Sequence, residues 1–419
     1  MVSSSSSGLS SLVSEQESVE SSLTQLDLLT PRQVTLMKVF SFLIGVNTLI
    51  VYNMFLNVML SFEAVIWPGH LFNDLCGGFN QLAAMLVTFY FMWKPRLSTH
   101  TKITLYCGVT AVIVGLLLPF IPQFLHGNEN FTAAVVLLSL AVFVLGLTAG
   151  VFQCQGFAYA VITDEPTITY VSLGNGFAGV YSFVMYTIFF EGVFDKDSLI
   201  DQVNLCWVLF VSGVVVAVVQ LAFSSYIFRQ EWFVNRLQAH EMASDTSSAI
   251  HHEDRSFKDI LKDTYKFAFA SGWIFFVTIC VYPMVGPFSW PVTSTWMNAL
   301  NGVFQVGDML FRFIPELGGK WLLSRKVSMI SSLVRPLIFF PLFLLPARVA
   351  SIGFLDNEWF LLFVMLIFVL SNGWLATCNQ MHCMQGVSGR ETNAAANILT
   401  VGIISQVTVS LFFSKVFIL

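Results

Sequence analysis

Two ionisable side chains of opposite charge, Asp308 and Arg312, lie four residues apart in an otherwise apolar part of the chain. Four residues make about one turn of an α-helix, so the carboxylate and the guanidinium can pair on one face. In a membrane span each charged group costs roughly 2.5–3.5 kcal/mol unless it is paired or faces a water-filled cavity. The pair therefore indicates a polar pathway through the protein, with a purely structural or gating ion pair as the alternative.

Amide side chains recur in the other apolar stretches, where each needs a hydrogen-bond partner or a cavity because lipid offers neither. They are Asn47, Asn53, Asn80, Gln81, Gln153, Gln155, Gln305, Asn372 and Gln380. Such a set suits the lining of one central cavity for a neutral, partly aromatic solute that forms hydrogen bonds. The alternative is that individual amides only join helices, at about 0.6 kcal/mol each. Arg335 can either belong to this polar set or extend to the membrane surface, as a long basic side chain at the end of a span can do.

The composition places these residues in a polytopic membrane protein built of α-helices. The 419 residues are 56% hydrophobic and only 11% charged, with a mean hydropathy of +0.74, whereas a soluble protein of this length carries far more charge. Helices of about 20 apolar residues span the hydrocarbon layer. We expect about eleven spans, near 36–61, 70–93, 102–125, 133–162, 168–192, 203–228, 264–286, 293–319, 328–347, 359–383 and 393–418. The small net charge of −5 indicates no nucleic-acid partner.

Polar segments divide the chain into four parts. Residues 1–34 are Ser-rich and predict a disordered cytoplasmic tail, and residues 229–263 form a long loop after the sixth span. The division leaves an N-terminal bundle of six helices (35–228) and a C-terminal bundle of five (264–419). Lys and Arg gather in the loops on the side of the tail, which predicts that this side is cytoplasmic and that the C-terminus is extracellular. A glycosylation sequon at Asn130 lies on the predicted outer side.

Small residues and one proline indicate where helices pack closely or bend. Gly174, Gly176 and Gly179 form a ridge in the fifth span that suits close helix packing. Pro283 can break or kink the seventh span and free backbone carbonyls. The spans contain no nucleophile beside a base and no set of metal ligands, so the sequence predicts neither an enzyme nor a bound metal or cofactor.

Several motifs, taken together and in this order, resemble those of the equilibrative nucleoside transporter family. Gln305, Asp308 and Arg312 are similar to the family's Asp-x-x-x-Arg signature and its upstream amide. Further similarities are Gln153 followed by the glycine ridge, Tyr282-Pro283 in the seventh span and Ser371-Asn372-Gly373 in the tenth. The resemblance covers roughly residues 36–418.

One departure from the family pattern lies in the first span. The family usually has Pro-Trp-Asn where this chain has Val51-Tyr52-Asn53, so a phenol replaces an indole. The resemblance implies a fold of the major-facilitator type, with six-helix and five-helix bundles related by pseudo-symmetry. A solute would bind between the bundles near the midplane and cross by alternating access as they rock.

The resemblance implies a facilitative, or equilibrative, transporter of nucleosides or nucleobases, including purine uptake, in the plasma membrane. Its partners would be that small molecule and the lipid bilayer, and the oligomeric state stays unknown. Gln153 would bind the base, with Leu49 and Tyr52 packed beside it. The ribose hydroxyls would be bound by Asp308 and Arg312, assisted by Gln305.

Helix packing or gating would fall to Gly174, Gly176, Gly179, Pro283 and Asn372. Two alternatives stay open. The first is a proton-coupled nucleoside or nucleobase transporter that uses Asp308. The second is a transporter for another small polar solute such as a sugar.

Overall fold

The computed structural model describes residues 29–70, 73–92, 97–162, 167–239, 256–283, 285–349, 353–385, 387 and 390–418. Most of the tail expected at residues 1–34 and the middle of the loop expected at residues 229–263 lie outside the described residues. The described flanks of both segments are helical: α2 begins at Pro31, residues 231–239 form a helix, and α10 begins at Phe257.

Capping side chains explain why these helices begin early. Thr30 and Gln33 form a reciprocal capping box, and Pro31 fits the first helical position because its missing N–H needs no partner there. Ser256 and Asp259 form the same arrangement at the start of α10. Asn357 accepts hydrogen bonds from the backbone N–H groups of Trp359 and Phe360 at the start of α13.

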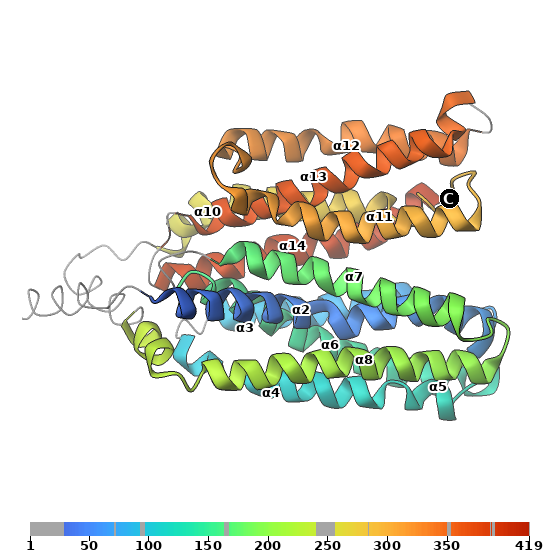
Figure 1. Ribbon diagram of the computed structural model, residues 1–419, viewed down its shortest axis with the longest axis horizontal. Helices are drawn as coiled ribbons and strands as arrows, with labels where there is room; N and C mark the ends of the chain where they lie inside the picture. The colour runs from blue at the N-terminus through green and yellow to red at the C-terminus, as the bar shows by residue number, and fades with distance from the viewer. Residues whose placement is uncertain are drawn as a thin grey trace, which may run out of the picture.

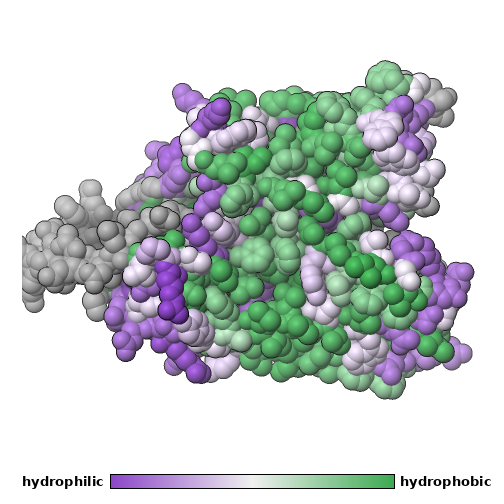
Figure 2. Space-filling view, in the orientation of Figure 1, coloured by the Kyte–Doolittle hydropathy of each residue, from purple (hydrophilic) through white to green (hydrophobic). Residues whose placement is uncertain are grey.

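Eleven long helices in the described residues confirm the predicted all-α fold of about eleven spans. They are α2 (Pro31–Ser61), α3 (Asn73–Met92), α4 (Leu97–Leu117), α6 (Phe131–Tyr159), α7 (Ile168–Gly192), α8 (Leu199–Ile227), α10 (Phe257–Val281), α11 (Ser294–Arg312), α12 (Arg325–Arg348), α13 (Glu358–Met384) and α14 (Arg390–Ile418). A short helix, α5 (Phe120–Phe124), and several single turns join them. Nine candidate membrane spans are found among the described residues, and the face seen in Figure 2 carries a broad apolar band between more polar ends.

The helices form two bundles that lie side by side (Figure 1). Helices α2 to α8 make up the N-terminal bundle, and α10 to α14 make up the C-terminal bundle. The bundles meet where α7 packs against α11 and α13, and where α14 packs against α3 and α6. Helix α11 is the shorter and more polar of the central helices, and it carries Asp308 and Arg312 at the boundary between the bundles.

A common apolar core joins the two bundles at the end of the molecule where α2 begins, which we call the tail end. It combines Phe40 and Phe157 of the N-terminal bundle with Phe267, Met384 and Ala396 of the C-terminal bundle. At the opposite, far end, two other large apolar clusters of described residues each lie within one bundle. The tail end is therefore closed by side-chain packing between the bundles.

The glycines of α7 lie where backbones approach closely. A Cβ atom at Gly174 would lie 2.1 Å from the carbonyl oxygen of Phe42 in α2, and one at Gly176 would lie 2.8 Å from the Cα of Met309 in α11. Gly174 therefore brings α2 and α7 together within one bundle, whereas Gly176 brings α7 and α11 together across the boundary.

Gly174→Ala should lower the thermal unfolding midpoint of the purified protein, because overpacking against a backbone atom costs about 1–3 kcal/mol. Gly78→Ala in α3 is the matched control, since a Cβ there would meet nothing within 4 Å. Equal midpoints for the two variants in a detergent thermal-shift measurement would contradict the close packing of α2 and α7.

Candidate solute site between the bundles

Asp308 and Arg312 form a buried ion pair on α11. Arg312 donates from Nε and Nη2 to the same carboxylate oxygen, Oδ2, at 2.9 and 2.8 Å. The two residues are only 7% and 5% exposed, so the charges depend on each other and on neighbouring dipoles rather than on bulk water. Asp308 and Arg312 thus pair within one helical turn, as their spacing predicts.

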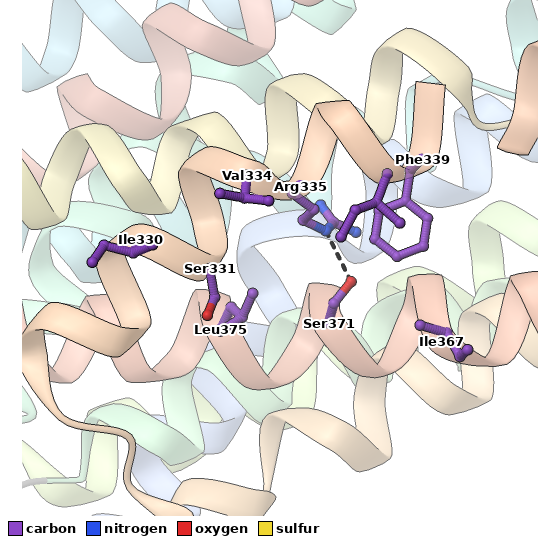
Figure 3. A pocket seen from close by; sticks show the side chains of 9 residues that line it. Ile330, Ser331, Val334, Arg335, Phe339, Ile367, Ser371 and Leu375 are labelled. Atoms are coloured by element: carbon purple, nitrogen blue, oxygen red, sulfur yellow. Dashed lines mark hydrogen bonds between the residues drawn. The ribbon is translucent and has the colours of Figure 1, made fainter. Parts of the chain in front are cut away.

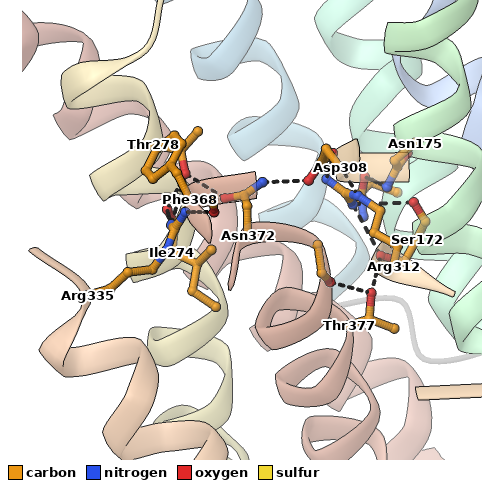
Figure 4. A network of polar contacts seen from close by, with 12 residues as sticks. Ser172, Asn175, Ile274, Thr278, Asp308, Arg312, Arg335, Phe368, Asn372 and Thr377 are labelled. Carbon is orange, nitrogen blue, oxygen red and sulfur yellow. Dashed lines mark hydrogen bonds and ion pairs between the residues drawn. The ribbon is translucent and has the colours of Figure 1, made fainter. Parts of the chain in front are cut away.

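Arg312 also connects the two bundles. Its Nη1 donates to the backbone oxygen and to Oγ of Ser172 on α7, at 3.3 and 3.1 Å. The Ser172 hydroxyl in turn lies 3.0 Å from the Thr377 hydroxyl on α13, as Figure 4 shows. The guanidinium therefore belongs to the candidate solute site and also to a contact that holds the bundles together, next to the tail-end core.

Further contacts at the tail end cross the same boundary. Lys38 of α2 lies 3.9 Å from the carboxylate of Glu316, in the turn that follows α11. The ring of Tyr170 on α7 contacts that of Phe313 edge-on, with centroids 6.4 Å apart. The bundles are therefore in contact from the tail end as far as the polar contact at Arg312.

Gln153 and Gln305 both approach α7, at Asn175 and Gly179, which lie one turn apart. The Gln153 amide oxygen accepts a hydrogen bond of 3.4 Å from Asn175, which is one turn after Ser172. A Cβ at Gly179 would lie 2.4 Å from Oε1 of Gln305, so the glycine makes room for this amide. Helix α7 therefore gathers Gln153, Gln305 and the ion pair around one stretch of small residues.

Leu49 and Tyr52 lie on α2, in the N-terminal bundle. Both are partly buried on α2 and pack against the far-end core of the N-terminal bundle. The Tyr52 hydroxyl lies 3.5 Å from the position of a Cβ on Gly77 in α3. The structure thus places the predicted apolar wall on the far-end side of the N-terminal bundle.

Several of the other amides join helices within the N-terminal bundle. Asn47 donates to Gln220 of α8 at 2.9 Å, and Asn80 donates to the Val142 carbonyl of α6 at 3.3 Å. Gln155 lies 3.2 Å from a ring nitrogen of His100 on α4. These contacts favour the interpretation of Asn47, Asn80 and Gln155 as ties between helices.

Pro283 and Asn372 have different surroundings. Pro283 directly follows the end of α10, where the chain turns toward α11. Asn372 lies in the polar network itself, because its amide nitrogen donates to Asp308 Oδ1 at 2.6 Å. Asn372 therefore contacts the central carboxylate directly.

Arg335 does not extend to the membrane surface. It lies near the middle of α12, is 1% exposed, and forms hydrogen bonds only with groups of α10 and α13 among the described residues. A groove of about 350 Å³ between α12 and α13 passes beside it (Figure 3). The groove is lined mostly by apolar side chains, and none of the predicted solute-binding residues contributes to it.

Sequence reasoning missed the hydroxyl groups of this site. Ser172, Thr278 and Thr377 lie in the network around Asp308 and Arg312. A Ser or Thr in a membrane helix commonly donates to the carbonyl one turn earlier, as Thr377 does to Gly373. Nothing in its sequence context therefore distinguishes a hydroxyl that reaches another helix.

Solved structures identify the class of fold. The proton:xylose symporter XylE of the major facilitator superfamily superposes with a TM-score of 0.70, covering 92% of this chain and 88% of that one at 12% identity. The transporter FucP of the same superfamily, in an outward conformation, gives a TM-score of 0.53 over 92% of this chain and 95% of that one, also at 12% identity. The chain has the fold of major facilitator transporters.

Sequence relatives narrow the class. Nucleoside transporter 1 of Plasmodium vivax is 24% identical over 265 residues, which cover 61% of each chain. Equilibrative nucleoside transporter 1 of Homo sapiens is 30% identical over 174 residues, covering 37% of this chain and 36% of the human protein. The chain thus matches less than two thirds of the length of either relative, and no model of a protein family matches it. These relatives confirm the resemblance to the equilibrative nucleoside transporter family.

Asp308→Asn should destabilise the protein strongly, because breaking a buried ion pair leaves an uncompensated charge at a cost of about 3–5 kcal/mol. Adding Arg312→Gln should recover part of the lost stability, since the double variant buries one charge fewer. Thermal unfolding of the purified variants measures both effects.

The exposed pair of Lys196 and Glu191 provides the control. Their side chains are 49% and 38% exposed, so Lys196→Gln should change stability by less than about 1 kcal/mol. A double variant no more stable than Asp308→Asn alone would show that the buried pair is not held by charge compensation.

Proposed function

We propose that this protein is a facilitative transporter that moves nucleosides across a membrane by alternating access. The observation that carries the proposal is the buried Asp308–Arg312 pair, which lies at the boundary between two major-facilitator bundles and contacts both of them. Relatives named nucleoside transporters support the class of solute.

The chemistry of the site suits a ribose ring joined to a flat base. Vicinal hydroxyls both donate and accept, so a carboxylate and a guanidinium side by side can bind them with charge-assisted hydrogen bonds. Gln153 offers an amide beside Asn175 of α7, where it can bind the edge of a base. Leu49 and Tyr52 supply the apolar wall, and Gln305 assists from one turn before Asp308. Nucleobases, which share the flat ring but lack the sugar, would use the Gln153 side alone.

Closure at one end suits alternating access. In this structure the tail-end core and the Arg312–Ser172 contact hold the bundles together at that end. A solute that draws Arg312 away from Ser172 would weaken this contact from within the site. Binding of the solute would thereby favour opening at the tail end, which is the coupling that a rocking transporter needs.

Facilitated diffusion is favoured over proton coupling by the surroundings of Asp308. Both carboxylate oxygens accept from donors, Oδ2 from Arg312 and Oδ1 from Asn372. Both oxygens are therefore occupied by fixed donors, which suits a residue that binds and orients a solute better than one that carries protons.

The predicted residues are tested by uptake of labelled adenosine, inosine, uridine and hypoxanthine into proteoliposomes, with and without a proton gradient. Gln153→Ala and Asp308→Ala should each reduce nucleoside uptake more than tenfold in correctly inserted protein. Gln123→Ala, which removes an exposed amide bonded to Trp207 at the far end, should leave uptake unchanged.

The outcomes separate the candidates. Uptake of nucleosides that is insensitive to the proton gradient would support facilitated diffusion. Gradient-driven accumulation that disappears in Asp308→Asn would instead establish proton coupling. No uptake of any of the four compounds by folded wild-type protein would refute the nucleoside proposal.

We propose a plasma-membrane location with the tail end in the cytoplasm and the C-terminus outside. Asn130 lies exposed in a turn at the far end, before α6. In a eukaryotic expression host, treatment with an N-glycosidase should shift the wild-type protein on a gel, and Asn130→Gln should abolish that shift. A shift that persists in the variant would show that the glycan is attached elsewhere. If sequons introduced at each end are modified only at the tail end, the tail end lies outside and the proposed orientation is wrong.

A further inference from the structure

We propose that Arg335 is a positioning residue that holds the Asp308 carboxylate through a hydrogen-bond relay of fixed direction, by way of Thr278 and Asn372. Its effect on solute binding rests on the proposed function, whereas its coupling to Asp308 does not. The relay spans four helices of the C-terminal bundle and is drawn in Figure 4.

Three contacts make up the relay. Arg335 Nη1 donates to Thr278 Oγ1 at 3.0 Å, and Thr278 Oγ1 lies 2.5 Å from the Asn372 amide oxygen. The Asn372 amide nitrogen then lies 2.6 Å from Asp308 Oδ1. A guanidinium of α12 is thereby connected to a carboxylate of α11 through one hydroxyl and one amide.

The two ends of the relay fix its direction. Arginine has only donors and an ionised carboxylate has only acceptors. The Thr278 hydroxyl must therefore accept from Arg335 and donate to Asn372, and the Asn372 amide must present its nitrogen to Asp308. Thr278 Oγ1 also lies 2.8 Å from the Ile274 carbonyl, but its contact with the Asn372 amide oxygen is the shorter one, and two oxygens can share that contact only if the hydroxyl donates.

Arg335 is held rigidly enough to direct such a relay. Besides the bonds already named, Nε donates to Ser371 Oγ at 2.9 Å and Nη2 donates to the Phe368 carbonyl at 3.1 Å. The guanidinium carbon lies 4.6 Å from the centre of the Phe368 ring, a cation–π distance. A lysine has one nitrogen and cannot reach these separate acceptors on α10 and α13, so the site requires an arginine.

The relay lies within one bundle, whereas the Arg312 contact crosses from one bundle to the other. All members of the relay belong to α10, α11, α12 and α13, which pack together in one bundle, so the relay can persist when the bundles rock. The Arg312–Ser172 bonds cross between bundles and must break when the bundles rock. Arg335 is thus the permanent counter-charge of Asp308, which leaves Arg312 free to exchange Ser172 for a solute hydroxyl.

The experiment interrupts the relay at its middle. Thr278→Val keeps the shape of the side chain and leaves Arg335 bonded to the Ile274 carbonyl, but it removes the hydroxyl. Thr278→Ser restores the hydroxyl and is the matched control. Uptake kinetics would be measured in proteoliposomes for these two variants, for Arg335→Gln, and for Arg335→Gln combined with Thr278→Val.

Thr278→Val and Arg335→Gln should each raise the KM for adenosine by about tenfold, the scale of one lost hydrogen bond to a charged group. The double variant should be no worse than the single ones, because both changes cut the same relay. Each should also bring the KM values for adenosine and its 3′-deoxy analogue closer together, an effect that general destabilisation does not produce. Thr278→Ser should behave like the wild type.

Additive effects in the double variant, or an unchanged KM ratio in Thr278→Val, would overturn the relay and leave Arg335 as a tie between helices. If Arg335→Gln fails to fold, Thr278→Val against Thr278→Ser still decides the matter through this ratio.

Thermal unfolding without solute separates the two proposals. Asp308→Asn and Thr278→Val should show non-additive changes in unfolding midpoint, since they act on one network. If the changes in midpoint are non-additive in the variants and the wild-type protein transports no nucleoside, the relay is upheld and the proposed function is refuted. Additive midpoints in an active transporter would refute the relay alone.

Discussion

A buried charge that lipid cannot solvate must find its partners inside the protein, and this constraint organises the centre of the molecule. Two guanidiniums, of Arg312 and Arg335, are arranged around the single carboxylate of Asp308. One lies directly against it, and the other is connected through a hydroxyl and an amide. The packing of α10, α11, α12 and α13 follows from these bonds, because each helix supplies a member that the others need.

Helix α7 of the other bundle packs against this charged group and supplies acceptors for it. Its small residues let α2 approach on one side and α11 on the other, and Ser172 provides the acceptors that Arg312 uses. The same helix therefore belongs structurally to one bundle and functionally to both. The few polar bonds between Arg312 and Ser172 suit a contact that opens and recloses in the proposed transport cycle, whereas the apolar cores within each bundle suit permanent association.

The sequence predicts the spans and the ion pair because both depend on local information. Hydropathy shows which segments can cross a membrane, and a spacing of four fixes the pairing of Asp308 with Arg312. The environment of Arg335 could not be predicted in the same way. Its depth depends on the exact ends of α12, and its partners come from helices far apart in the chain. The same limit applies to Ser172 and Thr278, whose hydroxyls are satisfied locally in most helices.

The shared core at the tail end has a thermal consequence. A state open at that end would expose side chains such as Phe40, Phe233 and Phe267 to water. Exposure of apolar surface raises the heat capacity, so the two states differ in heat capacity as well as in shape. The ratio of their populations would then follow a curved dependence on temperature, and cooling would weaken the closure that hydrophobic packing provides. A sealed end built from aromatic side chains would make the resting orientation of the proposed transporter sensitive to temperature.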